Sequence, residues 1–155
     1  MKPENLIFNE DHTKIKIIDM GISSKYKDIH FDEEHVEQRG TFRYMSPEQF
    51  DGKISLKTDV WAFGCILMEF ATGLRPYHQV PEERIPVLVS EQKISPLDYA
   101  ITELTDQISI ILTNSELRNL IKNCFSYSYV QRWPAIVLKR DKFFKKFQKD
   151  DIFLH

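Results

Sequence analysis

Several features that would assign this chain to a specialised class of protein are scarce. It has only two cysteines, Cys65 and Cys124, in 155 residues, which excludes a framework of disulfides. Both cysteines lie within apolar helical patterns, so we expect reduced thiols that fill the core. The five histidines show no paired Cys/His spacing of the kind that binds zinc, and a structural metal is therefore not predicted.

Charge of one sign is not in excess either. Lys and Arg total 21 against 23 Asp and Glu, and the formal net charge of -2 supplies no general attraction to nucleic acid or to an anionic membrane. The longest nearly continuous apolar run, 60–71, is far shorter than the roughly 20 residues of a membrane-spanning helix. The first residues lack the apolar segment of a secretory signal. We expect an intracellular protein, cytoplasmic or nuclear, with no nucleic-acid or membrane partner.

The chain otherwise has the composition of an ordinary globular domain. Hydrophobic residues make up 42% and charged residues 28%, without internal repeats or low-complexity runs, so we expect a single unit. Residues 6–8 and 14–18 are short runs of β-forming residues separated by a turn-forming sequence, which predicts a hairpin. Residues 22–39 are polar and show neither helical nor strand periodicity, which is typical of a long surface loop.

Helices are predicted farther along the chain. Residues 58–73 are apolar almost all round, with Asp59 near the start and Gly73 at the end, and such a helix must be buried on all sides. Pro134 is expected to open the last helix, and residues 80–112 to contain one or two more. A further apolar stripe predicts a helix that packs on the first, and it consists of Leu117, Leu120, Ile121, Cys124 and Phe125.

Four short motifs occur in a fixed order along this framework. They are KPEN at 2–5, DMG at 19–21, GTFRYMSPE at 40–48 and DVWAFG at 59–64, and Arg132 precedes a Trp-Pro pair near the end of the chain. Each motif alone is weak. In this order, with Asn5 and Asp19 at the two ends of a hairpin, they resemble the C-terminal lobe of a eukaryotic protein kinase of the serine/threonine type. The resemblance covers essentially the whole chain.

This resemblance implies a fold and a division of the chain. The fold class would be mainly α, a protein-kinase-like C-terminal lobe with a short N-terminal β-hairpin, which is part of an α+β fold in a complete kinase. Residues 1–155 would be a partial kinase domain, with the end of the catalytic loop and the hairpin at 1–18, the activation segment at 19–48 and the helical lobe at 58–147. The apolar helix that begins near Asp59 would be the central structural pillar of that lobe.

The chemistry of such a site rests on oxygen ligands. Phosphoryl transfer depends mainly on positioning and charge neutralisation, which requires oxygens that hold Mg²⁺ against the phosphates. A carboxylate and a carboxamide brought together by a tight hairpin supply them. The resemblance implies ATP and Mg²⁺ as cofactors, with Asp19 as the main magnesium ligand and Asn5 as the second. Asn5 and Asp19 alone are also compatible with a second interpretation, a hairpin whose polar end residues bind no ligand.

The resemblance also assigns roles to other residues. Lys2 would lie beside the transferred phosphoryl group, and Thr41 would help to position the catalytic carboxylate and the acceptor hydroxyl. Ile7 would form part of the apolar floor beneath the adenine. Glu48 and Arg132 would form a buried bidentate ion pair that ties the activation segment to the last helices, and two unrelated surface charges are the alternative.

Regulation of the predicted activation segment departs from the usual pattern. No Ser or Thr occurs between Lys25 and Gly40, so a phosphate that orders the loop by pairing with arginine has no obvious acceptor there. Either the loop is not switched, or acidic side chains take the place of the phosphate. The acidic candidates are Asp32, Glu33, Glu34 and Glu37.

The C-terminal residues 139–149 interleave lysines and an arginine with phenylalanines. A basic amphipathic helix that binds a membrane or a calmodulin-like protein has this pattern. We favour the simpler interpretation, a last helix whose phenylalanines pack on the lobe and whose lysines are solvated.

The kinase pattern also predicts what lies outside this chain. The aspartate that accepts the hydroxyl proton would precede Met1 by one position, and the glycine-rich loop, the strand lysine and its helix glutamate belong to an N-terminal lobe. We therefore expect part of a protein serine/threonine kinase that is inactive as this isolated chain, with an upstream lobe and a Ser- or Thr-bearing protein substrate as partners. A non-catalytic, pseudokinase-like binding or scaffold module is the alternative.

Overall fold

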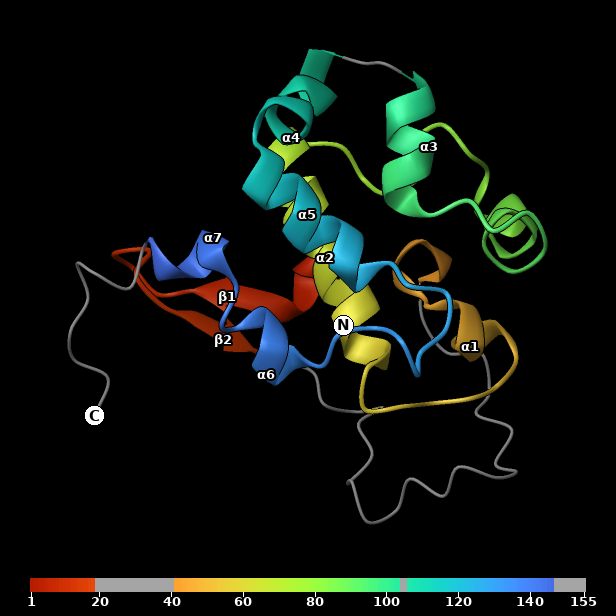
Figure 1. Ribbon diagram of the computed structural model, residues 1–155, viewed down its shortest axis with the longest axis horizontal. Coiled ribbons are helices and arrows are strands. Elements are labelled where there is room, and N and C mark those ends of the chain that lie inside the picture. Colours follow the sequence, from red (N-terminus) through yellow and green to blue (C-terminus); the bar gives the residue numbers. More distant parts are fainter. Residues whose placement is uncertain (19–40, 104–105, 147–155) are drawn as a thin grey trace.

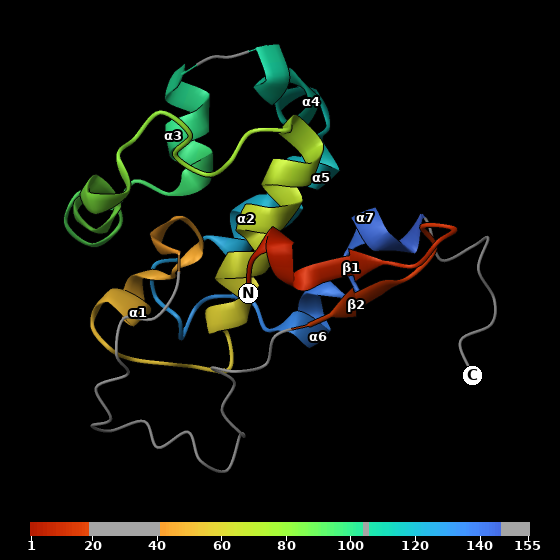
Figure 2. The same ribbon diagram turned by 180° about the vertical axis from the view of Figure 1, so that it is seen from behind.

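The computed structural model describes residues 1–18, 41–103 and 106–146 of the chain. This part is mainly helical and begins with a two-stranded antiparallel hairpin, so the predicted fold class is confirmed. Figure 1 shows helix α2 (Thr58–Thr72) running through the middle of the molecule, in contact with helix α5 (Ser115–Cys124). The same view from behind, in Figure 2, shows the hairpin together with the last two helices on one side of this pair.

The remaining elements are short. Those before α2 are the 3-10 turn η1 (Pro3–Asn5), strands β1 (Leu6–Phe8) and β2 (Ile15–Ile17), the 3-10 turn η3 (Phe42–Tyr44) and helix α1 (Pro47–Phe50). Those between α2 and α5 are η4 (Glu82–Arg84), the π-helical turn η5 (Val87–Glu91), α3 (Pro96–Glu103), η6 (Asp106–Ile108) and α4 (Ser109–Thr113). Helices α6 (Ala135–Leu138) and α7 (Lys142–Lys145) follow α5. The stretch 80–112 thus contains α3 and most of α4, in agreement with the one or two helices predicted there, and also the short turns η4, η5 and η6.

The hairpin forms where the sequence predicts it. Its turn is held by Asn9, whose side-chain oxygen accepts the N–H of Lys14 at 2.7 Å, and by Asp11, which accepts the N–H of Thr13 at 3.1 Å. Successive side chains of a strand point to opposite faces, so Ile7 lies on the face opposite to that of its strand neighbours. The cross-strand pairs are Leu6 with Ile17, Ile7 with Lys16, and Phe8 with Ile15.

Helix α2 also matches its prediction in extent. It ends at Gly73, which adopts a left-handed φ of 71° and donates its N–H to the carbonyl of Glu69 at 2.7 Å. Trp61 is fully buried at the centre of the core. The expectation that α2 is buried on all sides was wrong at its last turn, because the side chain of Phe70 is 51% exposed. Its ring lies beside that of Phe8 in the hairpin, with 6.2 Å between the centroids.

Helices α2 and α5 pack closely because of one glycine. A Cβ atom at Gly64 would lie 2.5 Å from the Cβ of Cys124, closer than Cβ atoms approach other groups in proteins, and 3.1 Å from a ring carbon of Phe125, which is a tight contact. The predicted apolar stripe of α5 faces α2 and is buried. Cys65 and Cys124 are both free and buried, as expected of core residues.

The C-terminal helices differ from the prediction. Pro134 caps α6, but α6 has only four residues and is not the last helix. The side chain of Asp141 accepts the N–H of Phe143 at 2.9 Å and so opens a separate helix, α7. Phe143 and Phe144 pack against the core from α7, as expected, whereas 147–155 lie outside the described residues.

Candidate functional site

The first part of the predicted site lies where the chain enters and leaves the hairpin. Lys2 precedes η1, Asn5 ends it, and the N–H of Asn5 donates to the carbonyl of Lys2 at 3.1 Å. The carbonyl of Asn5 accepts the N–H of Ile18 at 2.8 Å, which joins the two ends of the hairpin. Lys2 and Asn5 are both half-buried. Asp19, which follows Ile18 in the chain, lies outside the described residues.

The position of Asn5 suits a hard cation. Its carboxamide oxygen is the kind of ligand that Mg²⁺ accepts. The hydrogen bond between the backbones of Asn5 and Ile18 places Asn5 beside the residue that precedes Asp19 in the chain. Within the ranges 1–18, 41–103 and 106–146, no group of three or more His, Cys, Asp and Glu side chains is arranged to hold a metal.

The start of the chain lies against the start of helix α2. The amino nitrogen of Met1 is 3.6 Å from Oδ1 of Asp59, whose side chain is 80% exposed. Asp59 occupies the first turn of α2, where the positive end of the helix dipole favours a carboxylate. Met1 also packs against the core cluster to which α2 contributes Trp61, so the segment that leads to Lys2 lies beside this helix.

Ile7 lies on strand β1 with its side chain 50% exposed. Its cross-strand partner is Lys16. An apolar side chain left half-open at this point is available to cover a flat apolar ligand or a further protein surface.

A second part of the site is formed by residues 41–46, called here the docking segment. Thr41 is half-buried and leads into η3, and its carbonyl accepts the N–H of Tyr44 at 3.1 Å. Gly40, which precedes it, lies outside the described residues. Ser46 is fully buried and forms a capping box with Gln49 at the start of α1. Both ends of the described docking segment are therefore fixed by local hydrogen bonds.

Tyr44 connects the docking segment to helix α2. Its hydroxyl donates to Oε2 of Glu69 at 2.6 Å. Burial of the phenol, together with this hydrogen bond and the negative charges of Glu69 and then Glu4, raises the pKa of Tyr44 well above its ordinary value. Met1 and Leu6, which flank the KPEN motif, pack against the core cluster that contains Tyr44, so the KPEN motif and the docking segment adjoin the same part of the core although they are about 40 positions apart in the sequence.

Glu48 and Arg132 form a buried bidentate ion pair. The Nη1 and Nη2 atoms of Arg132 donate to Oε1 and Oε2 of Glu48 at 2.7 and 2.9 Å. The guanidinium also donates to the carbonyls of Lys57 and Ser126, both at 3.0 Å, and lies 5.2 Å from the ring centroid of Trp61. The structure thus joins the two residues that the sequence predicts to pair.

The environment of Glu48 favours its ionised form. Burial opposes ionisation, but the hydrogen bonds and the positive charge of Arg132 outweigh it, so the pKa of Glu48 is lowered. The hydroxyl of Thr58, at the start of α2, adds a further hydrogen bond to Oε1 at 3.0 Å. Glu48 therefore connects α1, the start of α2 and the segment that follows α5.

Sequence reasoning missed three residues that hold the docking segment in place. Arg43 donates to backbone carbonyls in the loop after α2, Glu69 accepts from Tyr44, and Glu82 accepts the N–H of Phe42 at 3.2 Å. Glu69 carried a signal, because a carboxylate inside a helix that is otherwise apolar requires a polar partner. Glu82 carried none, because its partner is a backbone group remote in sequence.

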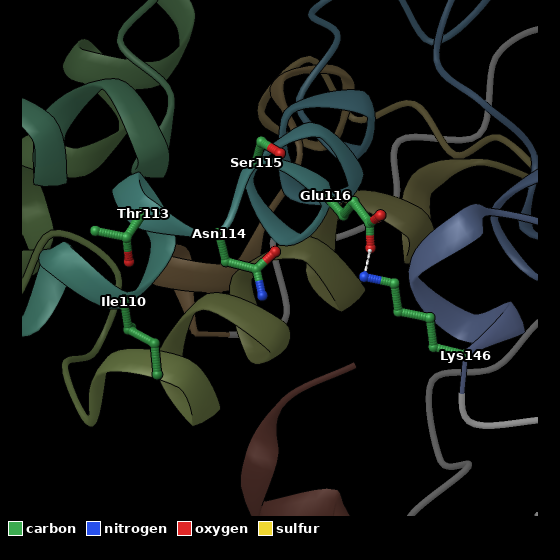
Figure 3. A pocket seen from close by; sticks show the side chains of 6 residues that line it. All are labelled: Ile110, Thr113, Asn114, Ser115, Glu116 and Lys146. Carbon is green, nitrogen blue, oxygen red and sulfur yellow. Dashed lines mark ion pairs between the residues drawn. The ribbon is translucent and has the colours of Figure 1, made fainter.

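A shallow hollow of about 460 Å³ lies elsewhere on the molecule, between helices α4, α5 and α7. Figure 3 shows the side chains around it, including the ion pair between Lys146 and Glu116, whose atoms are 2.6 Å apart. The side chain of Asn114 caps α5 by accepting the N–H of Leu117 at 3.0 Å. Of the residues predicted to bind ATP, Mg²⁺ or substrate, those that the structure describes do not line this hollow.

Comparison with known proteins finds protein kinases over most of the chain. The family described as protein kinase domain matches residues 1–144. The chain is 33% identical over 138 residues to the serine/threonine-protein kinase BCK1/SLK1/SSP31 of Saccharomyces cerevisiae, which is 87% of this chain and 9% of that protein. No helix in the part of the chain that the structure describes is long and apolar enough to cross a membrane.

Two further protein kinases with similar sequences come from a virus and from a parasite. The chain is 30% identical over 142 residues to the serine/threonine-protein kinase-transforming protein mos of a myeloproliferative sarcoma virus, 91% of this chain and 40% of that protein. It is 26% identical over 157 residues to calcium-dependent protein kinase 5 of Plasmodium falciparum, 100% of this chain and 26% of that protein. The chain spans less than half the length of each of these three relatives.

Proposed function

The chain belongs to the protein kinase family, and from this premise we propose that it is part of an ATP-dependent protein serine/threonine kinase. Such an enzyme transfers a phosphoryl group from Mg-ATP to a Ser or Thr hydroxyl of a protein. The proposal divides the chain into the end of the catalytic loop and the hairpin (1–18), the activation segment (19–48) and a helical lobe (58–147).

The observation that carries this proposal is that two motifs distant in the sequence pack on one core cluster. Met1 and Leu6, which flank the KPEN motif, pack against the cluster that contains Tyr44 of the docking segment. A phosphoryl donor held near Lys2 and an acceptor hydroxyl held near Thr41 would therefore meet between the two motifs. Lys2 would neutralise charge on the transferred group, and Thr41 would orient the acceptor.

Asn5 and Asp19 would hold the magnesium ion. The bound ion neutralises phosphate charge and orients the γ-phosphate for transfer. The hydrogen bond between the backbones of Asn5 and Ile18 supports the pairing, because it places Asn5 beside the residue before Asp19. Ile7 would contact the adenine from the exposed face of β1.

An upstream lobe would complete the nucleotide site. The hairpin exposes apolar side chains on both of its faces, and a second lobe that packed around it would cover them. Ile7, 50% exposed, lies on one face, and the other face carries Phe8 at 42%, Ile15 at 53% and Ile17 at 49%, with Phe70 of α2 at 51% beside Phe8. In the proposed enzyme, the general base and the glycine-rich loop belong to sequence upstream of residue 1. We therefore expect no phosphoryl transfer by residues 1–155 alone.

The test begins with the 5′ end of the native transcript, which defines the natural polypeptide containing this chain. That polypeptide, incubated with γ-labelled ATP and a degenerate Ser/Thr peptide library, should phosphorylate peptides only when Mg²⁺ is present. Asn5→Ala and Asp19→Asn should each lower kcat/KM by about 100-fold or more, since each removes a metal ligand.

Two matched variants control for effects on folding. Asp11→Asn makes the same chemical change as Asp19→Asn at the far end of the hairpin, and Asn119→Ala makes the same change as Asn5→Ala on the exposed side of α5. Both should retain activity. A natural polypeptide that folds, transfers no phosphate and binds no Mg-ATP would contradict the proposal and would favour the non-catalytic scaffold instead.

A further inference from the structure

Arg43 makes an unusual set of contacts for a residue in a surface segment. Its Nη1 donates to the carbonyl of Pro76 at 3.0 Å and to that of Tyr77, and its Nη2 donates to the carbonyl of Val80 at 2.8 Å. All three acceptors belong to residues 73–81, called here the bracing loop, which connects α2 to η4. One guanidinium therefore satisfies three backbone oxygens of a single loop, as the fixed fork of arginine allows.

The bracing loop is itself held at the point where it meets Arg43. Tyr77 is 1% exposed and adopts a φ of 53°, a left-handed conformation that a bulky residue rarely adopts. Its hydroxyl donates to the carbonyl of Ile94 at 2.7 Å, and its ring lies 5.5 Å from that of Tyr99. The surroundings thus fix the backbone turn that aims the carbonyls of the loop at Arg43.

The docking segment has three further attachments to neighbouring elements. The N–H of Phe42 donates to Oε1 of Glu82, directly after the bracing loop, and the hydroxyl of Tyr44 donates to Glu69 in α2. The thiol of Cys65 also points to the carbonyl of Arg43, with 3.7 Å between the atoms. Three consecutive residues, 42–44, are therefore each fixed to α2 or to the segment that follows it.

We propose that Arg43 is a positioning residue, which holds the docking segment against the bracing loop and so sets where Thr41 and the protein substrate lie. This rests on the proposed function. Arg43 does not touch the reacting atoms. It acts through the backbone of the docking segment, and the exposed residues of the bracing loop, such as Gln79 and Pro81, become part of the surface that the substrate meets.

The first experiment is hydrogen exchange on the 155-residue chain, and it needs no enzymatic activity. Arg43→Lys keeps the positive charge but replaces the fork with a single ammonium group. Amides in residues 41–46 and 76–84 should exchange about 10-fold faster or more, whereas those of α5 should keep their wild-type rates, since only local opening is eased. Arg84→Lys, the same change on an exposed arginine of η4, should leave all rates unchanged.

The second experiment measures steady-state kinetics in the natural polypeptide, with one peptide selected from the degenerate Ser/Thr library. Arg43→Lys should raise KM for this peptide about 10-fold and change KM for ATP by less than about two-fold. A general loss of stability would not separate these two constants. Arg84→Lys again serves as the control.

Two results would overturn the proposal. Exchange that is unchanged, or that is accelerated equally in α5 and in the docking segment, would make Arg43 either dispensable or a residue of global stability. Equal increases in the KM values for peptide and for ATP would show that Arg43 does not act on substrate position. If the polypeptide transferred no phosphate at all, the proposed function would fail, and the exchange rates would still decide whether Arg43 holds the two segments together.

Discussion

At the scale of single residues, Arg132 illustrates how a buried charge is stabilised by hydrogen bonds. A fully buried guanidinium has lost its hydration, and the loss is offset only where good hydrogen bonds replace the water. Its hydrogen bonds to two carboxylate oxygens and two backbone carbonyls meet this condition. The ion pair stabilises the fold only while both partners are present, because removal of either one leaves the other as an unpaired buried charge.

The first prediction concerns the carboxylate of this pair. Glu48→Gln removes the negative charge and should lower the free energy of unfolding at pH 7 by about 3 kcal/mol, since the Arg132 charge remains buried without its counter-ion. Urea denaturation of both proteins measures the difference. Glu116→Gln is the matched control, because its ion pair with the largely exposed Lys146 should contribute less than about 1 kcal/mol.

The pH dependence of this difference follows from the lowered pKa of Glu48. A carboxyl whose pKa is lower in the folded state stabilises that state fully above its unfolded pKa, about 4.3 for Glu. The stabilisation is lost as the pH falls through the folded pKa. The gap between wild type and Glu48→Gln should thus be constant from pH 7 to about pH 5 and shrink below it. A gap that widened on acidification would contradict the assignment.

The second prediction concerns the two thiols. Burial raises the pKa of Cys124 to about 12 and that of Cys65 well above its usual value, so neither forms the reactive thiolate near neutral pH. Labelling with a thiol reagent at pH 8 should proceed only as fast as the protein unfolds. The same protein in urea provides the control and should react at once. Rapid labelling of the native chain would contradict the burial of both side chains.

At the scale of elements, the contact between α2 and α5 decides the core. Gly64 in α2 faces Cys124 in α5, and the absence of a side chain allows the two backbones to approach. Glycine in the middle of a helix costs about 1 kcal/mol relative to alanine in an isolated helix. The packing of α2 against α5 must therefore outweigh that cost.

The third prediction tests this balance. Gly64→Ala should lower the free energy of unfolding by about 1–3 kcal/mol, because the new Cβ forces the helices apart and overpacking outweighs the gain in helix propensity. Thermal melts followed by circular dichroism measure the change. Gly73→Asn is the control, since no atom lies within 4 Å of a Cβ there and asparagine tolerates its φ of 71°. A Gly64→Ala protein more stable than wild type would contradict the close packing.

At the scale of the whole molecule, one side of the lobe exposes apolar side chains. The hairpin and the last turn of α2 contribute neighbouring groups, and the rings of Phe8 and Phe70 lie together there. An apolar surface of this kind promotes association when it faces water. The same surface is where the proposed upstream lobe would bind.

The fourth prediction follows from this surface. The 155-residue chain should associate with increasing concentration and bind a fluorescent apolar dye, and Ile15→Thr combined with Ile17→Thr should weaken both effects while keeping β-forming residues. Sedimentation and dye fluorescence measure them. Ile110→Thr in α4 is the matched control, because that side chain is 50% exposed but lies away from the hairpin. A native chain that stays monomeric and binds no dye would argue against a missing lobe.

The sequence predicted a helix or strand well where its start, its end and its periodicity are all marked by residues close together in the chain. The hairpin, helix α2 up to Gly73 and the buried stripe of α5 follow from turn residues, a left-handed cap and helical periodicity. The start of α7 was missed although Asp141 is a good N-cap, because the apolar and basic pattern continues across the break. The exposure of Phe70 was missed because periodicity reports an apolar face but not whether anything covers it.

By itself, the sequence of this chain determined the motifs and their order, since these depend only on residue type and position. The resemblance of these motifs to a kinase lobe predicted that Glu48 pairs with Arg132. Only the tertiary structure decided how the docking segment is held. The three acceptors of Arg43 are backbone carbonyls, which every residue possesses, and they converge on the guanidinium because of a turn at Tyr77. No residue type marks such a contact in advance, because it arises where the folded backbone places its oxygens.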